Sequence, residues 1–287
     1  MDDGRRHFNP EGSSVSIESL RLSRTNERTG TGKMRAIIIG AGRGARLMPT
    51  TADTPKCFAQ VGDKRILDWT VEAFSKNGID DLCFIGGYRI EQVKKAYPHF
   101  TFRHNEDWEN NNILLSLMHA EDLMDSPFVC CYSDILFTPE VVRRAAASPA
   151  DISLVVDTRW LDRYEHRSEH PSDDAEKVKV RNGQVTRVHR EIPEPEAHGE
   201  YIGVAKFSKE GAALLKEHYH EARKAYAGKP YREARVFEKA YLIHLFQDMI
   251  EQGIEMAHVD TPGGYIEVDT QQDFEYARRV WGKDGAE

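Results

Sequence analysis

The feature that most constrains this chain is a glycine-rich turn directly after a short apolar segment. Residues 36–39 read Ala-Ile-Ile-Ile and are followed by Gly40, which predicts a buried β-strand. Glycines at Gly40, Gly42 and Gly44 let the backbone turn sharply and approach a ligand with no Cβ in between. The chain therefore places an open backbone loop at the end of an interior strand.

Three permanent or near-permanent cations accompany this loop. Arg43 and Arg46 lie within it, and Lys56 follows shortly after. Exposed backbone N–H groups, including that of Ala41, together with fixed positive charges are typical of a receptor for several phosphate groups.

The same glycines allow other interpretations. The run from Gly40 to Ala45 fits a dinucleotide-binding pattern, with Asp63 at a suitable distance. That pattern must open directly into a helix, and Pro49 and Pro55 interrupt any helix here. A P-loop is excluded because no Gly-Lys-Ser/Thr closes the run. A tight turn with solvated arginines stays open as the plain structural alternative.

The whole stretch resembles the signature of nucleotidyltransferases that make sugar-nucleotides and their relatives. The shared residues form a G-x-G-x-R-L segment, a spacer and Pro-Lys: Gly42, Gly44, Arg46, Leu47, Pro55 and Lys56. The resemblance implies that Arg46 and Lys56 are catalytic. It also implies that the loop Gly40, Ala41, Gly42, Arg43 and Gly44 holds nucleotide phosphates.

Composition narrows the class of protein. The chain has 287 residues and a formal net charge of −8, with no dense Lys/Arg stripe, so no nucleic-acid partner is expected. No apolar run approaches the ~20 residues that a membrane helix needs. The four cysteines form neither a disulfide framework nor a C-x-x-C pair, which fits a cytoplasmic location.

Apolar runs alternate with amphipathic segments from residue 36 onward, which predicts an α/β fold. We expect a Rossmann-like, mixed but mostly parallel sheet flanked by helices, with a smaller mixed α+β acceptor or lid region. The expected strands are 36–39, 82–86, 100–104, 128–132 and 152–157, and the expected helices are 66–77, 90–97, 113–124 and 140–147.

The rhythm changes after residue 157. Segments 177–181 and 184–189 flank Asn182-Gly183, a combination that predicts a hairpin with a type I′ turn. Further expected elements are strands at 201–207, 255–259 and 265–268, and helices at 209–225, 237–252 and 270–281. We expect a polar tail at 1–33 and a nucleotidyltransferase domain at 34–287. Its nucleotide core would span 34–157 plus 254–282, and its acceptor region 158–253.

Two carboxylates stand at the ends of predicted strands. Asp134 follows the strand 128–132, and Asp269 follows the strand near the C-terminus. Meeting at one sheet edge, they could hold Mg²⁺ (or Mn²⁺), which takes one or two carboxylates plus substrate phosphates. The alternative for each is a helix N-cap, for which Thr270 competes with Asp269. Both positions match the aspartates through which the resembled family binds its metal.

A second part of the resemblance concerns the nucleobase. Asn111, Asn112 and Ser116 lie in a run similar to one in bacterial choline-phosphate and phosphonate cytidylyltransferases, although helix capping would also explain the asparagines. Gly87 and Tyr88 follow the second strand where that family reads the base. A plain strand-to-helix turn is the alternative there.

The acceptor side is predicted from charge and resemblance. Lys177 and Glu200 match family positions that face the acceptor, and Arg187 is one of several cations between residues 157 and 207. Such cations suit capture of phosphate or phosphonate oxygens, although solvated hairpin positions are the alternative.

The segment from His166 to His170 formally fits H-x-x-E-H, but its charged surroundings favour a solvated loop over a zinc site.

The resemblance implies a magnesium-dependent cytidylyltransferase that joins CMP from CTP to a small phosphonate or phosphorylated alcohol and releases pyrophosphate. A sugar-1-phosphate nucleotidyltransferase and a non-catalytic nucleotide-binding regulatory module are the alternatives. The expected partners are CTP and the acceptor, with no nucleic acid and no membrane, and a homodimer is left open.

Overall fold

The computed structural model describes residues 33–165, 167–169 and 171–282. Its strands are β1 (Arg35–Gly40), β2 (Gln60–Val61), β3 (Lys64–Arg65), β4 (Asp81–Gly86), β5 (Thr101–His104), β6 (Phe128–Tyr132), β7 (Ile135–Phe137), β8 (Ile152–Asp157), β9 (Lys177–Arg181), β10 (Gln184–Val188), β11 (Gly199–Phe207), β12 (Ala257–Thr261) and β13 (Tyr265–Glu267).

The α-helices of this part of the chain are α2 (Ile66–Ser75), α3 (Ile90–Ala96), α4 (Ile113–Met118), α5 (Pro139–Ala147), α6 (Leu161–Tyr164), α7 (Lys209–Tyr226), α8 (Leu242–Glu251) and α9 (Gln271–Val280). Single 3₁₀ turns are η1 (Ala45–Leu47), η2 (Lys56–Phe58), η3 (Glu121–Leu123), η4 (Ser172–Asp174), η5 (Glu194–Glu196) and η6 (Phe237–Lys239).

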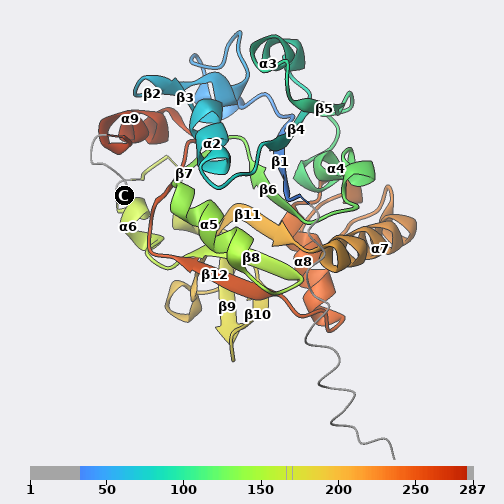
Figure 1. The fold of residues 1–287 in the computed structure, drawn as a ribbon. Helices are drawn as coiled ribbons and strands as arrows, with labels where there is room; N and C mark the ends of the chain where they lie inside the picture. The colour runs from blue at the N-terminus through green and yellow to red at the C-terminus, as the bar shows by residue number, and fades with distance from the viewer. Residues whose placement is uncertain (1–32, 166, 170, 283–287) are drawn as a thin grey trace, which may run out of the picture. The chain divides into compact units, whose positions relative to one another are not determined.

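One mixed sheet organises residues 33–282 (Figure 1). Its strand order is β5-β4-β1-β6-β11-β8-β12-β10-β9, and β9 pairs again with β11. Strands β5, β4, β1 and β6 are parallel, and antiparallel β11 joins them to the parallel pair β8–β12. The expected mixed sheet flanked by helices is confirmed. Its antiparallel share is larger than expected, because β11 is inserted between parallel strands and the β9–β10 hairpin joins the sheet.

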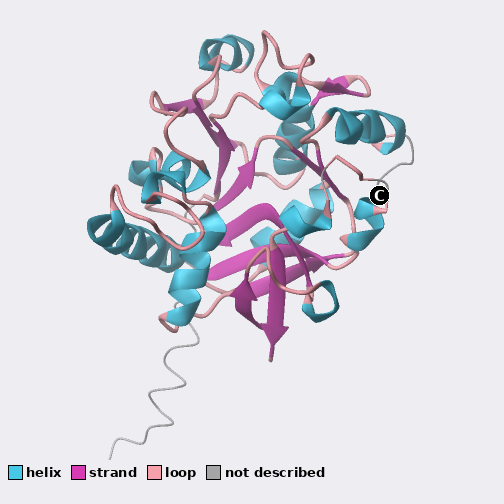
Figure 2. Ribbon diagram, turned by 180° about the vertical axis from the view of Figure 1, so that it is seen from behind, coloured by secondary structure: helices cyan, strands magenta, loops and turns pink. Residues whose placement is uncertain are grey.

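Both faces of this sheet are covered by helices (Figure 2). Ile37 belongs to a buried cluster with apolar side chains of α4, α7 and α8, whereas Ile38 belongs to a second cluster with those of α2, α3 and α5. Cys130 belongs to the first cluster and Cys131 to the second, as expected for adjacent strand residues on opposite faces. Each fully buried isoleucine contributes about 1.5–3 kcal/mol relative to an exposed one, so β1 anchors both layers.

A smaller apolar cluster supports the edge of the sheet where β1 and β6 end. It contains Leu47 from η1, Leu136 from β7, Ile266 from β13 and Phe274 from α9. Strands β7 and β13 pair antiparallel within it, with Ile135 opposite Glu267. The cluster thereby packs the glycine loop against the C-terminal segment, which is distant from it in sequence.

Several expected elements differ in extent. The helix expected over 113–124 ends at Met118 and resumes as η3, and the one expected over 237–252 is η6 followed by α8. The break lies at Ala240 and Tyr241, whose backbones are extended. The short strands β2, β3 and β7 were not expected, because two or three residues carry no readable periodicity. The turn at Asn182 and Gly183 has φ values of 52° and 76°, as a type I′ turn requires.

Among the described residues, the segment 162–174 is only in part the solvated loop that its charges suggest: Asp162, Glu165, Ser168, Glu169 and Asp173 are exposed, but two arginines are not. Residues 161–164 form α6, and the side chains of Arg163 and Arg167 are buried against carboxylates. His166 and His170, on which the zinc pattern depends, lie outside the described residues, as do residues 1–32 of the expected tail. The division into nucleotide core and acceptor region stays a prediction.

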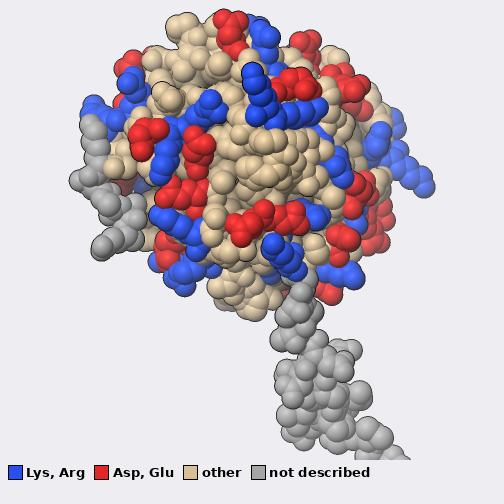
Figure 3. Space-filling view, turned by 45° about the horizontal axis from the view of Figure 1, so that its top comes forward, with Lys and Arg blue, Asp and Glu red and all other residues tan. Residues whose placement is uncertain are grey.

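Surface charge is finely mixed on the face drawn in Figure 3. Acidic and basic side chains alternate there in small groups. Pairs such as Arg143 with Glu140 (2.6 Å) and Arg103 with Asp122 (2.5 Å) show how neighbouring groups compensate one another. In the described part of the chain, no helix is long and apolar enough to cross a membrane.

Gly203 lies where the pairing of β11 with β8 shifts register, and replacing it should destabilise the protein strongly. Gly203 has a φ of +75°, and a Cβ there would lie 2.4 Å from Cδ2 of Tyr132. We expect Gly203→Ala to lower the free energy of unfolding by about 3 kcal/mol, because a left-handed backbone costs roughly 1–2 kcal/mol and overpacking adds about 1–3 kcal/mol. Urea unfolding measures the loss.

The matched control is Gly183→Ala. Gly183 has a nearly identical φ of +76°, but a Cβ added there would have no atom within 4 Å. This variant should lose only the backbone term, about 1–2 kcal/mol. Equal losses in the two variants would contradict the predicted contact with Tyr132.

Candidate active site

A cavity of about 410 Å³ opens at the edge of the sheet where β1 and β6 end. Its lining combines the glycine loop with polar and aromatic side chains from both halves of the chain: Ile39, Gly40, Ala41, Gly42, Gly44, Ala45, Arg46, Lys56, Trp108, Asn111, Asn112, Ile113, Ser116, Tyr132, Ser133, Asp134, Asp174, Glu176, Arg190, Glu200, Tyr201, Gly203, Tyr241, Tyr265, Glu267 and Asp269.

The glycine loop forms one wall of this cavity. Gly42 has open space where a side chain would be, so its backbone is accessible to a ligand. Gly44 has a φ of +67°, and a Cβ there would lie 2.8 Å from Cδ of Lys56. Glycine is therefore required at Gly44 both for the backbone conformation and for the close approach of Lys56. The loop packs directly on the buried lysine.

Lys56 is the centre of the site. Its Nζ donates to Oδ2 of Asp134 at 2.8 Å and to Oδ1 of Asp269 at 2.6 Å. The lysine is only 7% exposed. Burial by itself lowers the pKa of Lys56, but the charges and hydrogen bonds of the two aspartates outweigh it and raise that pKa above its ordinary value. The lysine is therefore a fixed cation.

The two aspartates are brought together by backbone pairing. Ser133 N donates to the Ile39 carbonyl (3.0 Å), and Val268 N donates to the Asp134 carbonyl (3.0 Å). The N-cap of α9 is Thr270, whose hydroxyl accepts from Asp273 N. The capping alternative for Asp269 is therefore wrong, and its carboxylate instead contacts Lys56 and Arg46, the latter at 2.5 Å.

A second wall of the cavity is amide-rich. Asn105 Nδ2 donates to Oδ1 of Asn111 (2.7 Å) and to Oγ of Ser116 (2.9 Å), and Asn111 donates back to Asn105 (2.9 Å). Asn112 caps α4 by accepting from Ile113 N at 2.8 Å. Three of the predicted nucleobase residues thus meet at the cavity. Asn105, which orients two of them, was missed by sequence reasoning, although its place just after β5 is the relevant signal.

Gly87 and Tyr88 contact the glycine loop, and Gly87 also contacts Trp108. Tyr88 N donates to the Ala41 carbonyl (2.9 Å), and a Cβ on Gly87 would lie 2.7 Å from that oxygen and from Cβ of Trp108. Arg43 lies over the Tyr88 ring, 5.6 Å from its centroid. Arg43, Gly87 and Tyr88 are not part of the described lining. They lock the glycine loop to the turn after β4.

The third wall is acidic and aromatic. Glu200 is buried, contacts Arg163 and accepts from the Tyr164 hydroxyl at 2.8 Å. Arg190 donates to Asp174 (2.5 Å) and to Glu176 (3.4 Å), and its guanidinium lies 4.4 Å from the centroid of Tyr241. Tyr132, Tyr201 and Tyr265 complete this wall.

A sequence profile of the MobA-like NTP transferase domain matches residues 36–225 of this chain. The chain belongs to this family.

Two relatives extend the match. The CTP:phosphoglutamine cytidylyltransferase of Campylobacter jejuni is 27% identical over 252 residues, covering 84% of this chain and 98% of that protein. The choline-phosphate cytidylyltransferase of Streptococcus pneumoniae is 32% identical over 106 residues, 36% of this chain and 46% of that protein. A glucose-1-phosphate uridylyltransferase is also among the relatives, over 43% of this chain. Nucleotidyl transfer is thus the shared activity of these relatives, and this chain is a nucleotidyltransferase.

The fold agrees. The solved structure of the phosphocholine cytidylyltransferase from Streptococcus pneumoniae matches with a TM-score of 0.65 at 18% identity, covering 87% of this chain and 99% of that one. The two proteins therefore share a Rossmann-like α/β fold.

The structure places the predicted acceptor cations Lys177 and Arg187 outside the described cavity lining. Lys177 is buried, and its Nζ donates to the Arg190 carbonyl. Arg187 lies on β10 opposite Lys179, and neither Lys177 nor Arg187 is among the described lining residues of the nucleotidyltransferase cavity. Other cations of this half are engaged by carboxylates, as in the pair Lys179–Glu196. Of the three predicted acceptor residues, Glu200 reaches the cavity, and so does Arg190, one of the other cations between residues 157 and 207.

Glu176 predicts a pH-dependent stability. Burial raises the pKa of Glu176 from 4.5 to about 7, against the opposing charge of Arg190. The folded protein holds the proton of Glu176 more tightly than the unfolded chain does. The resulting contribution to the free energy of unfolding is complete below pH 4.5 and is lost as the pH rises to about 7. Relative to Glu176→Gln, the wild type should therefore lose roughly 3 kcal/mol of unfolding free energy across this range.

Urea unfolding at about pH 4.5 and pH 8 measures this difference. Groups that titrate in both proteins cancel in the comparison, and Glu191→Gln, at an exposed position near Arg190, is the control that should follow the wild type. Parallel pH profiles for the wild type and Glu176→Gln would contradict the assignment.

Proposed function

We propose that this nucleotidyltransferase is a magnesium-dependent cytidylyltransferase. It transfers CMP from CTP to a phosphate or phosphonate oxygen of a small acceptor that also carries an ammonium group, and it releases pyrophosphate. The observation that carries the proposal is the meeting of Lys56, Asp134 and Asp269 beside the open glycine loop, in a cavity that also has an acidic and aromatic wall.

The donor side is supported by charge and backbone geometry. The accessible backbone at Gly42 and the side chain of Arg46, which is 62% exposed, suit the β- and γ-phosphates. The amides of Asn111 and Asn112 and the hydroxyl of Ser116 offer both donors and acceptors to a base edge. The relatives from Campylobacter jejuni and Streptococcus pneumoniae are both cytidylyltransferases, which favours cytosine here.

The two aspartates fit a magnesium ion. Both carboxylates already converge on one cation, the ammonium of Lys56, at 2.8 Å and 2.6 Å. Carboxylate oxygens are the donors that Mg²⁺ prefers, with substrate phosphates and water filling its other positions. Asp134 and Asp269 would hold Mg²⁺ (or Mn²⁺), which when bound neutralises the α-phosphate and makes its phosphorus more electrophilic.

The protein's own part in the reaction is positioning and charge neutralisation. An acceptor oxygen attacks the α-phosphorus and forms the new P–O bond, while the bond to pyrophosphate breaks and pyrophosphate leaves with the electron pair. Lys56 would place a fixed positive charge at the α-phosphate, and Arg46 would hold the leaving group. No covalent intermediate with the protein is required.

The ammonium group of the acceptor is inferred from the third wall. Glu176 is 8% exposed and lines the cavity, and its contacts with Arg190 (3.4 Å) and the Tyr132 hydroxyl (3.5 Å) are both long. An acceptor ammonium would give this carboxylate a short partner and would lie among tyrosine rings that attract cations. The acceptor phosphate or phosphonate would then point toward Lys56 and Arg190.

The two alternatives fit less well. A sugar-1-phosphate needs several neutral hydrogen-bonding partners for its hydroxyls, whereas carboxylates and phenols dominate this wall. A regulatory nucleotide-binding module needs no pair of carboxylates around a buried lysine at the phosphate loop.

A substrate screen tests the proposal. Pyrophosphate release is measured for CTP, UTP, dTTP and GTP against 2-aminoethylphosphonate, ethylphosphonate and glucose-1-phosphate. We expect the highest kcat/KM with CTP and the amino-phosphonate, and at least a ~10-fold loss when the amine is absent, about 1.4 kcal/mol. Glu176→Gln should shrink this preference for the amine, whereas Glu191→Gln should leave it intact.

Two results of this screen would contradict the proposal. A higher kcat/KM with another triphosphate would overturn the cytosine preference. Equal use of ethylphosphonate and its amino derivative by the wild type, or glucose-1-phosphate as the best acceptor, would overturn the assignment of the acidic wall.

Asp134→Asn tests the proposed metal site. The amide keeps the shape of the side chain but removes the charge, so kcat should fall by at least ~100-fold at saturating Mg²⁺. Asp162→Asn, at an exposed position paired with Arg159 (2.6 Å), should keep the wild-type rate. A cooperative unfolding transition confirms that Asp134→Asn is folded, and near wild-type turnover by that variant would refute the role of Asp134.

A further inference from the structure

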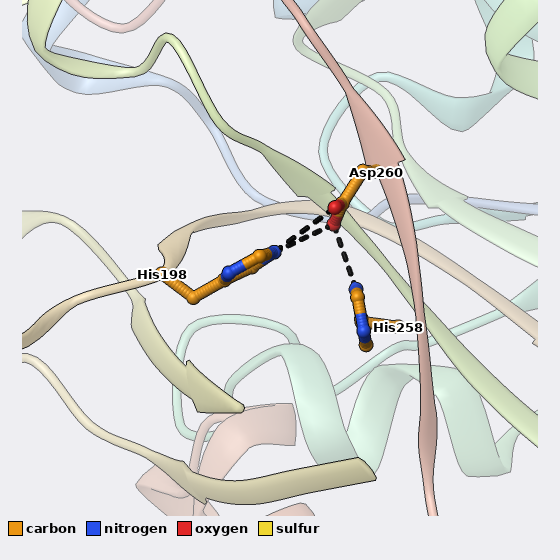
Figure 4. A group of neighbouring side chains, drawn as sticks. All are labelled: His198, His258 and Asp260. Atoms are coloured by element: carbon orange, nitrogen blue, oxygen red, sulfur yellow. Dashed lines mark hydrogen bonds and ion pairs between the residues drawn. The ribbon is translucent and has the colours of Figure 1, made fainter. Parts of the chain in front are cut away.

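A second group of metal-ligand side chains lies outside the cavity lining. His198, His258 and Asp260 point toward one another from two segments of the chain (Figure 4). Nε2 of His198 lies 2.9 Å and 3.0 Å from the two carboxylate oxygens of Asp260, and Nδ1 of His258 lies 2.7 Å from Oδ1. One ligand atom from each residue can be chosen so that all three lie within 4.8 Å of one another.

The fold explains why these side chains meet. His258 and Asp260 are two residues apart on β12, so they share one face of the strand. His198 immediately precedes β11, and its backbone N–H donates to the Val178 carbonyl of β9 at 2.8 Å. Strand β12 pairs with β10 only through Ala257 opposite Gln184, so the cluster lies where these two strands diverge.

The cluster is accessible to solvent, and its charge suits a metal cation. The side chains of His198, His258 and Asp260 are 32%, 19% and 38% exposed. Within the described ranges, the carboxylate of Asp260 has ion-pair contacts with the two imidazoles and with no lysine or arginine. With neutral imidazoles the group has a charge of about −1, which suits a divalent cation.

We propose that His198, His258 and Asp260 bind one transition-metal ion of the zinc class, with a fourth position open to water. Two imidazole nitrogens and one carboxylate are donors that favour Zn²⁺, Co²⁺ or Ni²⁺ over Mg²⁺. Each neutral imidazole would bind the ion through the nitrogen that now faces Asp260 and keep its proton on the other ring nitrogen, and small side-chain rotations bring the ligand atoms to about 2.1 Å from the ion. The site shares no residue with the proposed magnesium site.

The ion would connect two segments that support the acceptor side of the cavity. Strand β11, which begins beside His198, carries Tyr201 and Gly203 to the lining. Strand β12 leads through Gly263, whose N–H donates to Asp157 at 2.9 Å, to Tyr265 on β13. A metal bond between the two strands would restrain both segments at once.

The test uses untagged full-length protein freed of metal with a chelator. Co²⁺ is the probe, because coordination by nitrogen and oxygen ligands in a tetrahedral site gives strong visible absorption. We expect one Co²⁺ per chain, displaced by Zn²⁺ and not by Mg²⁺, and a rise in Tm with Zn²⁺. His258→Gln and Asp260→Asn should each weaken Co²⁺ binding by at least ~10-fold and abolish the rise in Tm, whereas His258→Cys should restore binding.

His220→Gln is the matched control. His220 is a surface histidine hydrogen-bonded to Glu121 at 2.6 Å, away from the cluster, and its loss should leave Co²⁺ binding unchanged. The proposal is overturned if the wild type shows no saturable Co²⁺ absorption. It is also overturned if His258→Gln and Asp260→Asn, both folded by circular dichroism, bind Co²⁺ as tightly as His220→Gln.

Discussion

The buried ion triad of Lys56, Asp134 and Asp269 is the interaction on which the rest of this structure depends. Withdrawing a charge from water costs several kcal/mol, so the lysine is stable at 7% exposure only because two carboxylates reach it. Those carboxylates come from the end of β6 and from the segment after β13, far apart in sequence. The glycine loop packs on the same lysine through Gly44, so loop, sheet edge and C-terminal segment are fixed together.

The charge balance of the cavity follows from this arrangement. The described lining contains the cations Arg46, Lys56 and Arg190 and a larger number of carboxylates: Asp134, Asp174, Glu176, Glu200, Glu267 and Asp269. A triphosphate entering such a cavity is repelled unless further positive charge accompanies it. The proposed magnesium ion would supply that charge on the donor side, and the proposed ammonium group of the acceptor would supply it at the acidic and aromatic wall. In this proposal, one surplus of negative charge would favour both substrates.

The sequence predicted the contiguous parts of the site and missed the parts assembled by tertiary contacts. Gly42, Gly44, Arg46 and Lys56 lie in one short stretch, and Asp134 follows a clear apolar strand, so pattern and resemblance located them. Asn105 orients Asn111 and Ser116, and Trp108 lines the cavity. Both lie in a loop that carries no such pattern, and neither was expected. Pairing between strands distant in sequence brings these groups together, and one sequence does not display that pairing.

Tertiary contacts also engage several of the cations that the sequence suggested for the acceptor. In the sequence, Arg163, Lys177 and Lys179 are among the cations between residues 157 and 207 that could capture an anion. In the structure Arg163 and Lys179 are paired with Glu200 and Glu196, and Lys177 binds the Arg190 carbonyl. Counting charges along a chain overstates the number available to a ligand, because burial forces each to find a partner.

The antiparallel strand β11 explains how one sheet edge can serve two substrates. Because β11 runs opposite to β6 and β8, its first residues lie at the edge where those strands end. Glu200 therefore stands opposite Asp157 and faces the same cavity as Asp134. The proposed donor wall comes mainly from the parallel strands, and the proposed acceptor wall from β11 and the loops around the hairpin. On this proposal, changes in the acceptor wall would alter the second substrate without disturbing the lysine and the glycine loop.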